Sequence, residues 1–531
     1  MARQLLEQLT RFYFDKNRWW LPLIAGGVYS FALPPFNHET HWLFSLFPLL
    51  NFLILLPLFA FAVHPSFKRA LSHMFLYGYA AAFGQYHWLV FDRVEGLWAL
   101  VILGLFLASA VVASFYLIAG LLFRIMQRRC GTAAIIVYPA VWVLIDYARS
   151  LGDMAFPWAF LGYSFTPILP FSQCASVTGV WGLTFIAVLG NTIAWNLLRH
   201  IRVGVSLKSL ARIPILFVAL IIIIGLTGWF RIAEHSRADA PCKKIALLQS
   251  NIDQFRWSNK MLDTAFAVSE SLALAAAAAG PDLMILPESA LLCYLDHRRE
   301  YRERVFSWVK KTHAPLIFGS LDWQNAPEGS SSDYFVYNTA FFADTGASAL
   351  KSYYKERLVP FSEAIPFEGL FPILSRVNLG EADFRRGTDP TIFKTGGGLS
   401  MVPLICYESI FPGYVRSRVR SGGGNLIVNI TNDGWFGRSS GPRHHAMMAR
   451  MRSIENGVSL ARCANSGISM FVDPLGKVLG TTPLYKRTML IRRVPVETIP
   501  TLYSRFGDWF VGLCAAVAAI SIVYAFIKRK P

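Results

Sequence analysis

The sequence predicts a chain in two parts, a multi-span α-helical membrane domain and an α/β domain outside the bilayer. Of 531 residues, 54% are hydrophobic and 16% charged, whereas soluble proteins carry about 25% charged residues. Long apolar stretches fill the chain up to about residue 235 and recur near its end. Between them, short apolar runs typical of buried strands alternate with helical stretches. The composition excludes a disordered protein and an ordinary cytosolic enzyme.

Eight apolar stretches are candidates for membrane-spanning helices, since a span needs about 20 residues. They cover 19–35, 43–63, 71–91, 97–123, 133–150, 174–198, 213–231 and 506–527. Pro34 and Pro35 interrupt the first stretch and leave its end open. We therefore expect a membrane domain of seven transmembrane helices over residues 1–235. A C-terminal transmembrane helix with a cytoplasmic tail is expected over residues 504–531.

The basic residues predict the orientation of these spans. Lys and Arg gather in alternate loops, at 3–18, 68–69, 124–129, 199–212 and 528–530. The intervening short loops hold only Arg93 and Arg149. The positive-inside rule then places both termini in the cytoplasm and residues 236–503 outside, which is the periplasm in a bacterium with two membranes. The net charge of +18 is explained by this topology, so we expect no nucleic-acid partner.

Residues 236–503 are expected to form one α/β domain. Apolar strand-like runs occur at 245–248, 283–286, 316–319, 402–405 and 426–430, and helical stretches at 260–279, 297–313 and 443–457. Alternating patterns predict hairpins over 335–354 and 469–479. Uninterrupted apolar strands interleaved with helices are typical of sheets that are covered by helices.

Three reactive side chains follow predicted strands, where α/β active sites collect. Glu288 follows the run 283–286, Lys355 follows the second hairpin strand, and Cys406 follows the run 402–405. A helix expected from Glu408 would favour the Cys406 thiolate through its dipole. Each residue alone has an ordinary interpretation as a loop cap, a surface charge or a small buried side chain. Together they supply a general base, a cation for an oxyanion and a nucleophile for acyl transfer.

The local sequence around these residues resembles that of the nitrilase (carbon–nitrogen hydrolase) superfamily. The segments Leu286–Ser289, Tyr353–Phe361 and Ile405–Glu408 are similar, in order, to its three catalytic segments. With seven spans before this domain and one after it, the whole chain resembles the apolipoprotein N-acyltransferase family. Departures from the family's commonest wording are Ser362, Glu356–Arg357 and Gly434, and none removes a reactive group.

The resemblance implies an α-β-β-α sandwich and an enzyme of the bacterial inner membrane. Such an enzyme transfers an acyl chain from a phospholipid, through a cysteine thioester, to the N-terminal amine of a diacylglyceryl-apolipoprotein. By this resemblance Glu288 is the base, Lys355 stabilises the oxyanion and Cys406 is the nucleophile. It also assigns five further residues, with Glu363, Glu408 and Tyr407 supporting the site and Trp257 and Trp435 binding substrate. The apolar segment 364–374 is either a packed loop or a mobile arm that gates the site.

Two other interpretations stay open, a membrane-anchored amidase that uses water and a transporter or receptor whose outer domain only binds ligand. We expect no metal site, since His444 and His445 lack a third ligand at convincing spacing, and no cofactor. Nothing in the sequence requires more than a monomer.

The aromatic loop around Trp158 is expected at the membrane interface, with a lipid entry path as the alternative. Asp146 and Arg149 are either functional or a pair that satisfies itself.

Overall fold

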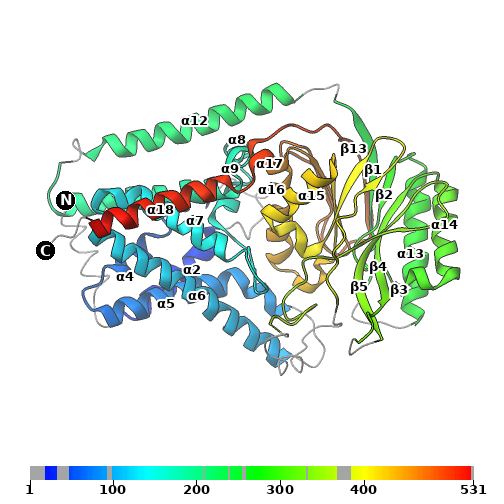
Figure 1. Cartoon of the computed structure of the whole chain (residues 1–531), viewed down its shortest axis with the longest axis horizontal. Helices are drawn as coiled ribbons and strands as arrows, with labels where there is room; N and C mark the ends of the chain where they lie inside the picture. The colour runs from blue at the N-terminus through cyan, green and yellow to red at the C-terminus, as the bar shows by residue number, and fades with distance from the viewer. Residues whose placement is uncertain are drawn as a thin grey trace.

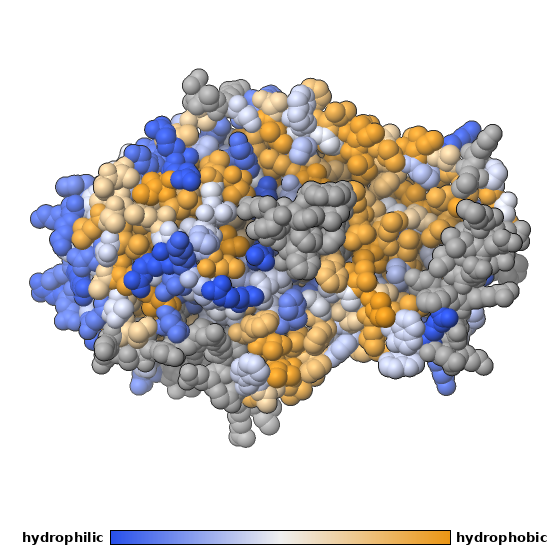
Figure 2. Space-filling model, turned by 180° about the vertical axis from the view of Figure 1, so that it is seen from behind, coloured by the Kyte–Doolittle hydropathy of each residue, from blue (hydrophilic) through white to orange (hydrophobic). Residues whose placement is uncertain are grey.

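The structure is a computed structural model that describes residues 18–32, 47–91, 98–206, 210–236, 240–253, 259–329, 333–367 and 384–527. Apolar helices occupy one half of the molecule and two β-sheets the other, with α15 and α16 lying between the two halves (Figure 1). The space-filling view shows the same division, because apolar residues gather over the helical half and hydrophilic residues over the far end (Figure 2).

The apolar half consists of helices from both ends of the chain. They are α2 (Leu21–Tyr29), α3 (Phe47–Leu50), α4 (Leu56–Ala62), α5 (Phe67–Tyr86), α6 (Trp98–Arg129), α7 (Ala134–Ala148), α8 (Leu169–Ser172), α9 (Ala175–Thr178), α10 (Val180–Arg202), α12 (Arg212–His235), α17 (Leu502–Phe506) and α18 (Trp509–Ile527). Within the described ranges, four helices are long and apolar enough to cross a membrane, namely Trp98–Arg129, Gly131–Ala148, Val180–Arg202 and Arg212–His235. The apolar helix Trp509–Tyr524 is shorter. The predicted total of eight spans therefore stays a prediction.

The expected span 43–63 is not one continuous helix in its described part. Helices α3 and α4 are separated by a turn at 51–55. The side chain of Asn191 on α10 accepts a hydrogen bond from Leu55 N at 2.7 Å and donates to Asn51 O. The Asn51 amide donates to Pro48 O and to Ser164 Oγ. These amides pair backbone groups that a broken helix would otherwise leave unpaired in an apolar environment.

The other half is built from two sheets packed face to face. The first sheet has the order β13-β1-β2-β4-β5-β6, with β3 paired to β4, and the second has the order β12-β11-β10-β9-β8-β7. Their strands are β1 (Cys242–Gln249), β2 (Leu283–Ile285), β3 (Leu291–Tyr294), β4 (Leu316–Asn325), β5 (Tyr334–Ala343), β6 (Lys351–Tyr354), β7 (Phe393–Lys394), β8 (Ser400–Ile405), β9 (Leu426–Thr431), β10 (Ser459–Ala464), β11 (Met470–Val472), β12 (Val478–Thr481) and β13 (Thr488–Pro495).

Helices cover both outer faces of this sandwich. The helices α13 (Asn259–Ala277) and α14 (Arg299–Thr312) cover the first sheet through a core that includes Phe266 and Trp308. The helices α15 (Pro412–Gly422) and α16 (Gly441–Asn456) cover the second sheet through Val415 and Ala449. A separate apolar core fills the space between the sheets. The layers therefore follow the α-β-β-α order that the resemblance implies.

The helix expected from Glu408 begins later than the sequence indicated. Residues Cys406–Ile410 form a 3₁₀ turn, and the α-helix starts only at Pro412. Pro412 lies at the first helical position, where proline is favoured because its missing N–H has no partner to lose. The backbone at Cys406 has a φ of +49°, which no residue inside an α-helix adopts.

The two halves share a continuous apolar core. Tyr407, Ile410, Met448 and Ile454 of the sandwich belong to the same buried cluster as the apolar helices. Hydrogen bonds cross the joint from Tyr407 Oη to Ala155 O at 2.6 Å and from Val180 N to Glu455 Oε1 at 2.9 Å. The sandwich is thus seated on the helical half through the layer that contains α16.

Candidate active site

The three reactive residues of the sequence follow three strands, of which β6 pairs only antiparallel with β5 but runs in the same direction as β4 and β2. Glu288 follows β2, Lys355 follows β6, and Cys406 follows β8. All three are buried, with 5%, 1% and 9% of their surfaces exposed. Parallel strands bring their carboxyl ends to one edge of a sheet, so the fold gathers residues that are 118 positions apart in sequence, counted from 288 to 406.

Lys355 lies between two carboxylates. Its Nζ is 2.7 Å from Glu363 Oε1 and 3.4 Å from Glu288 Oε1. The amide of Asn338 on β5 donates to the same two oxygens, at 3.1 Å and 2.9 Å. The other oxygen of Glu288 accepts from Asn432 N at 2.8 Å. Because each carboxylate has fixed partners, the ammonium group is held in one place.

Burial alone would lower the pKa of Lys355, but Glu363 and Glu288 together raise it above its ordinary range. The side chain is therefore a permanent cation at neutral pH. A fixed buried cation is suited to stabilising negative charge that develops nearby during a reaction.

The turn that carries Cys406 is fixed by Glu408. One Glu408 oxygen accepts from Ile405 N at 2.7 Å, and the other accepts from Tyr353 Oη and Glu356 N, each at 2.7 Å. These bonds tie the turn to the end of β6, directly before Lys355. The left-handed backbone of Cys406 costs energy for a residue with a side chain, and such strain is maintained only where the surroundings fix it.

The Cys406 thiol lies near enough to Glu288 and Lys355 to interact electrostatically with both. Burial raises its pKa above the ordinary range, the Glu288 carboxylate raises it further, and Lys355 and Thr431 offset part of this effect. The resting side chain is therefore a thiol. The α-helix whose dipole was expected to favour the thiolate begins only at Pro412, after the 3₁₀ turn that contains Cys406.

A second polar group lies behind the cysteine. His445 Nε2 is 3.1 Å from Cys406 O, and its Nδ1 is 3.0 Å from Asp433 Oδ1. Asp433 also accepts two hydrogen bonds from Arg462, both at 2.8 Å. Burial would raise the pKa of Asp433, but Arg462 and His445 lower it to about 2. Asp433 thus stays ionised, and it fixes the imidazole that contacts the Cys406 carbonyl.

The sequence interpretation assigned no role to Asn338, Asn432 or His445. Asn432 follows strand β9 as Cys406 follows β8, so the strand-end criterion could have identified it. Asn338 lies within β5 and carries no local signal. Its position is set by the antiparallel pairing of β5 with β4 and β6, which sequence alone does not reveal.

The remaining predicted residues differ in how the structure places them. Tyr407 is buried beside Cys406, and its ring stacks on Phe156 at 6.1 Å between centroids. Trp435 is half-buried in the 3₁₀ turn Asp433–Phe436. Trp257 and most of the segment 364–374 lie outside the described residues.

Two predictions about the helical half concern residues that the structure describes. Trp158 is only 1% exposed and packs against Trp88 and His445, so its ring faces the protein interior, and the position of its loop at the membrane interface stays a prediction. Asp146 and Arg149 form an ion pair at 3.0 Å, which confirms that they satisfy each other.

Comparison with known proteins identifies both parts of the chain. The Carbon-nitrogen hydrolase family matches residues 244–502, and the Apolipoprotein N-acyltransferase N-terminal domain matches residues 25–193. Among solved structures, an amidase of the nitrilase superfamily from Nesterenkonia AN1 covers 49% of this chain and 94% of its own, with 22% identity and a TM-score of 0.35.

Full-length relatives match across both parts. The apolipoprotein N-acyltransferase of Geobacter metallireducens is 32% identical over 87% of this chain and 88% of the relative. The apolipoprotein N-acyltransferase of Bradyrhizobium diazoefficiens is 33% identical over 80% of this chain and 79% of the relative. The apolipoprotein N-acyltransferase of Chlorobaculum tepidum is 28% identical over 96% of this chain and 97% of the relative. Identity above 30% across more than two thirds of both chains, with both domains in order, shows that this chain belongs to the apolipoprotein N-acyltransferase family.

Proposed function

We propose that Glu288, Lys355 and Cys406 form the catalytic triad of a phospholipid-dependent N-acyltransferase. The observation that carries the proposal is the buried lysine between Glu288 and Glu363, which interacts electrostatically with a buried thiol on a strained turn. The acceptor is the α-amino group of the N-terminal S-diacylglyceryl cysteine of an apolipoprotein, and the donor is a membrane phospholipid.

In the first half-reaction, Cys406 Sγ attacks the ester carbonyl of the phospholipid while Glu288 takes the thiol proton. Deprotonation during attack suits this site because the resting pKa of the thiol is raised. Lys355 stabilises the oxyanion of the tetrahedral intermediate. The intermediate collapses as the C–O bond breaks, Glu288 returns the proton to the leaving oxygen, and lyso-phospholipid departs. The product on the enzyme is a thioester at Cys406.

In the second half-reaction, the lipoprotein amine attacks the thioester. Glu288 accepts a proton from the attacking nitrogen, and Lys355 again stabilises the oxyanion. The C–S bond then breaks, and the proton passes from Glu288 to sulfur. The products are the N-acyl amide and the free thiol, so Glu288 and Cys406 return to their starting protonation states.

The supporting residues act on the triad through position. Glu363 and Asn338 hold Lys355 and Glu288, and Glu408 fixes the cysteine turn. Tyr407 anchors that turn to Ala155 of the helical half. We assign Trp257 and Trp435 to substrate binding, and the segment 364–374 to an arm that covers the site and limits hydrolysis of the thioester.

We further propose that the enzyme spans the bacterial inner membrane eight times as a monomer. Residues 1–235 supply seven spans, residues 236–503 form the periplasmic catalytic domain, and 504–531 supply the last span and a cytoplasmic tail. Support comes from the charge alternation of the loops and from the apolar helices that share a core with the sandwich. Cys406 lies next to this joint, because its neighbour Tyr407 belongs to the shared core, and we propose that lipid substrates reach it from the membrane side.

The rival functions differ in their products and in their dependence on Cys406. An amidase that uses water would release ammonia from a small amide and would not need a helical half of this size. A transporter or receptor would keep its main activity in Cys406→Ala. The acyltransferase releases lyso-phospholipid and loses activity in that variant.

The proposal is tested by intact-protein mass spectrometry of the detergent-purified chain incubated with a defined phospholipid. We expect a mass increase of one acyl chain, which neutral hydroxylamine removes and which Cys406→Ala does not show. Cys463→Ala is the matched control, because Cys463 is a buried thiol of the same sandwich with no contact to Glu288 or Lys355 among the described contacts. A diacylglyceryl peptide should discharge the adduct. Wild-type protein without an adduct and without lyso-phospholipid would overturn the mechanism.

A further inference from the structure

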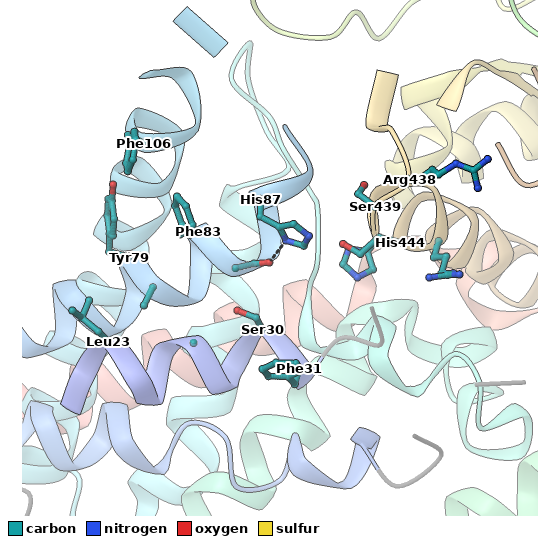
Figure 3. A pocket seen from close by; sticks show the side chains of 15 residues that line it. Leu23, Ser30, Phe31, Tyr79, Phe83, His87, Phe106, Arg438, Ser439 and His444 are labelled. Atoms are coloured by element: carbon teal, nitrogen blue, oxygen red, sulfur yellow. Dashed lines mark hydrogen bonds between the residues drawn. The ribbon is translucent and has the colours of Figure 1, made fainter. Parts of the chain in front are cut away.

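A cavity of about 770 Å³ opens where three apolar helices meet the start of α16 (Figure 3). One end is lined by apolar side chains of α2, α5 and α6, including Leu23, Tyr79, Phe83 and Phe106. Its volume lies in the range of pockets that bind small organic molecules, about 300–1,000 Å³. A cavity lined by helices of the membrane half is open to molecules with hydrocarbon chains.

The opposite end of the cavity is polar and basic. Arg438, Ser439 and Ser440 precede α16, and Arg443 and His444 lie in its first turn. Figure 3 shows Arg438, Ser439 and His444 across the cavity from Tyr79, Phe83 and Phe106. No acidic residue is among those that line the cavity in the described part of the chain. The N-terminal end of a 16-residue helix adds partial positive charge to the two guanidinium groups.

Two buried polar side chains at this end lack partners. His444 is 3% exposed and Ser440 is 5% exposed. Among the described residues, neither ring nitrogen of His444 nor the Ser440 hydroxyl has a hydrogen-bond partner. A buried polar group without a partner is energetically unfavourable, so such groups in a cavity point to a ligand that pairs with them. Burial, with smaller effects of His87 and Arg443, lowers the pKa of His444 to about 3, so His444 is neutral and the positive charge at this end comes from Arg438 and Arg443.

The cavity is separate from the catalytic cysteine. Neither Cys406 nor Glu288 nor Lys355 lines it. The consecutive residues His444 and His445 of α16 point in different directions, since His444 lines the cavity whereas His445 contacts Cys406 O. Aromatic rings pack around His445 on the side of the cysteine. Phe436 contacts Trp88 at 4.6 Å and Trp158 at 6.0 Å between ring centroids, and both Phe436 and Trp158 contact His445.

From these observations we infer that the cavity binds one glycerophospholipid that is not the reacting acyl donor. Its phosphate lies against Arg438, Ser440 and His444, and one acyl chain lies between α2, α5 and α6. The guanidinium groups at the basic end favour a phosphate group. The apolar end favours a ligand that also carries an acyl chain over a small free anion. The inference does not depend on the proposed acyl transfer, because it rests on groups outside the catalytic site.

The test uses the full-length protein in phospholipid vesicles that contain a photoactivatable dialkyl-ether phospholipid. This probe has no ester bond, so it cannot donate an acyl chain, and failure of acyl transfer cannot affect the result. We expect cross-links to peptides that contain Leu23–Phe31 and Tyr79–His87. The matched dialkylglycerol probe without phosphate should label these peptides far less.

Paired variants separate a bound lipid from lipids that merely surround the helices. A side chain added at Gly27 enters the cavity, and one added at Gly225 on α12 also meets no atom within 4 Å but lies outside the cavity. Gly27→Leu should reduce labelling and Gly225→Leu should not. Arg438→Gln and His444→Leu should each reduce it by about tenfold, the loss expected for one charge-assisted or buried contact. Arg299→Gln, at a surface ion pair on α14, is the charge control.

Three results would overturn the inference. Equal labelling of Gly27→Leu and Gly225→Leu would mean that the probe reports only surrounding lipid. Equal labelling by the probe without phosphate would remove the role of the basic end. Complete competition by inorganic phosphate at millimolar concentration would identify an anion site without a lipid chain.

Discussion

At the scale of single residues, the proposed nucleophile Cys406 rests as a thiol and would become a thiolate only during the reaction. A thiol with a raised pKa is stable in the resting protein, and the base we propose, Glu288, lies 118 residues earlier in the sequence, counted from 406 back to 288. Lys355 favours the thiolate and the oxyanion alike, because both place negative charge near Nζ. The enzyme therefore carries no exposed reactive thiolate between turnovers.

The raised pKa of Cys406 predicts a particular pH profile for its alkylation. The thiolate is the reactive form, and its fraction increases by about tenfold per pH unit below the pKa. We expect the alkylation rate of Cys406 to keep rising up to pH 9, and to be lower in Lys355→Met because the cation that lowers the thiol pKa is lost. Mass spectrometry of the alkylated peptide measures this rate.

Lys351→Met is the control, since Lys351 is an exposed lysine on the same strand β6. Its alkylation profile should match that of the wild type. A rate that levels off between pH 6 and pH 8 in the wild type would contradict a raised pKa and would instead indicate a resting thiolate.

Asn338 is predicted to be a positioning residue for the two carboxylates. Its amide donates to both Glu288 and Glu363, so Asn338→Leu keeps the approximate size and removes both hydrogen bonds. We expect kcat to fall by about tenfold or more, as for the loss of about 1–3 kcal/mol of contacts, with KM nearly unchanged. Steady-state kinetics with a diacylglyceryl peptide separates the two constants.

A purely structural role for Asn338 would give a different pattern. It would lower the amount of folded protein and leave kcat per folded enzyme intact. Asn325→Leu, at the exposed end of β4, should leave both constants at wild-type values. An Asn338→Leu enzyme with unchanged kcat would contradict the assignment.

At the scale of elements, breaks in the apolar helices are stabilised by side chains from neighbouring helices. Pro139 lies inside α7 and cannot donate to Ile135 O, its partner four residues earlier. Thr192 Oγ1 on α10 donates to this carbonyl at 2.8 Å. Asn191 performs the same role for the break between α3 and α4. Adjacent residues of α10 therefore pair backbone groups at one proline inside a helix and at one helix break.

This pairing predicts a coupling between Thr192 and Pro139. Thr192→Val should lower the free energy of unfolding by about 1 kcal/mol, because the Ile135 carbonyl loses its donor. In a Pro139→Ala background, residue 139 regains an N–H that can pair with Ile135 O, so the same change should cost less. Thermal or denaturant unfolding of the four proteins in detergent gives the double-mutant cycle.

Thr227→Val is the matched control for this cycle. The Thr227 hydroxyl bonds only to Ile224 O within its own helix α12 in the described contacts. Its loss should change stability little in either background. Equal costs of Thr192→Val with and without Pro139 would show that the hydroxyl does not compensate for the proline.

At the scale of the whole molecule, the sequence predicted those features that depend on composition or on short local segments. The order of apolar helices, sandwich and final helix follows from composition, and Glu288, Lys355 and Cys406 lie in short segments with distinctive wording. Contacts between distant segments were not predictable. Asn338 reaches the site through strand pairing, and the helix break at 51–55 depends on Asn191, 136 residues beyond Leu55. Single-residue and local signals cannot encode such tertiary partners.

The cavity, too, could not be predicted from the sequence. Its basic end belongs to α16 and its apolar end to α2, α5 and α6, so no continuous segment contains a lipid-binding pattern. Gly84 on α5 illustrates the requirement for close packing, since a Cβ there would lie 1.8 Å from Ser30 Oγ on the neighbouring helix segment. The site exists only once the helices and the sandwich are assembled.

Orientation in the membrane is the last property of the whole molecule that can be tested directly. The loop charges predict that the sandwich lies in the periplasm and the loop before α5 in the cytoplasm. Thr345, in the β5–β6 turn, and Ser66, before α5, are both exposed. We expect a membrane-impermeant maleimide to label Thr345→Cys in spheroplasts. Ser66→Cys should react only after the membrane is permeabilised.

The wild-type chain sets the background for this measurement, since the described residues include seven free cysteines, of which Cys130, Cys174 and Cys242 are partly exposed. Labelling of each variant is therefore counted above that of the wild type, with and without permeabilisation. The reverse pattern would place the sandwich in the cytoplasm, where the proposed diacylglyceryl acceptor on the outer leaflet could not reach Cys406. The topology and the proposed reaction would then fail together, because one requires the other.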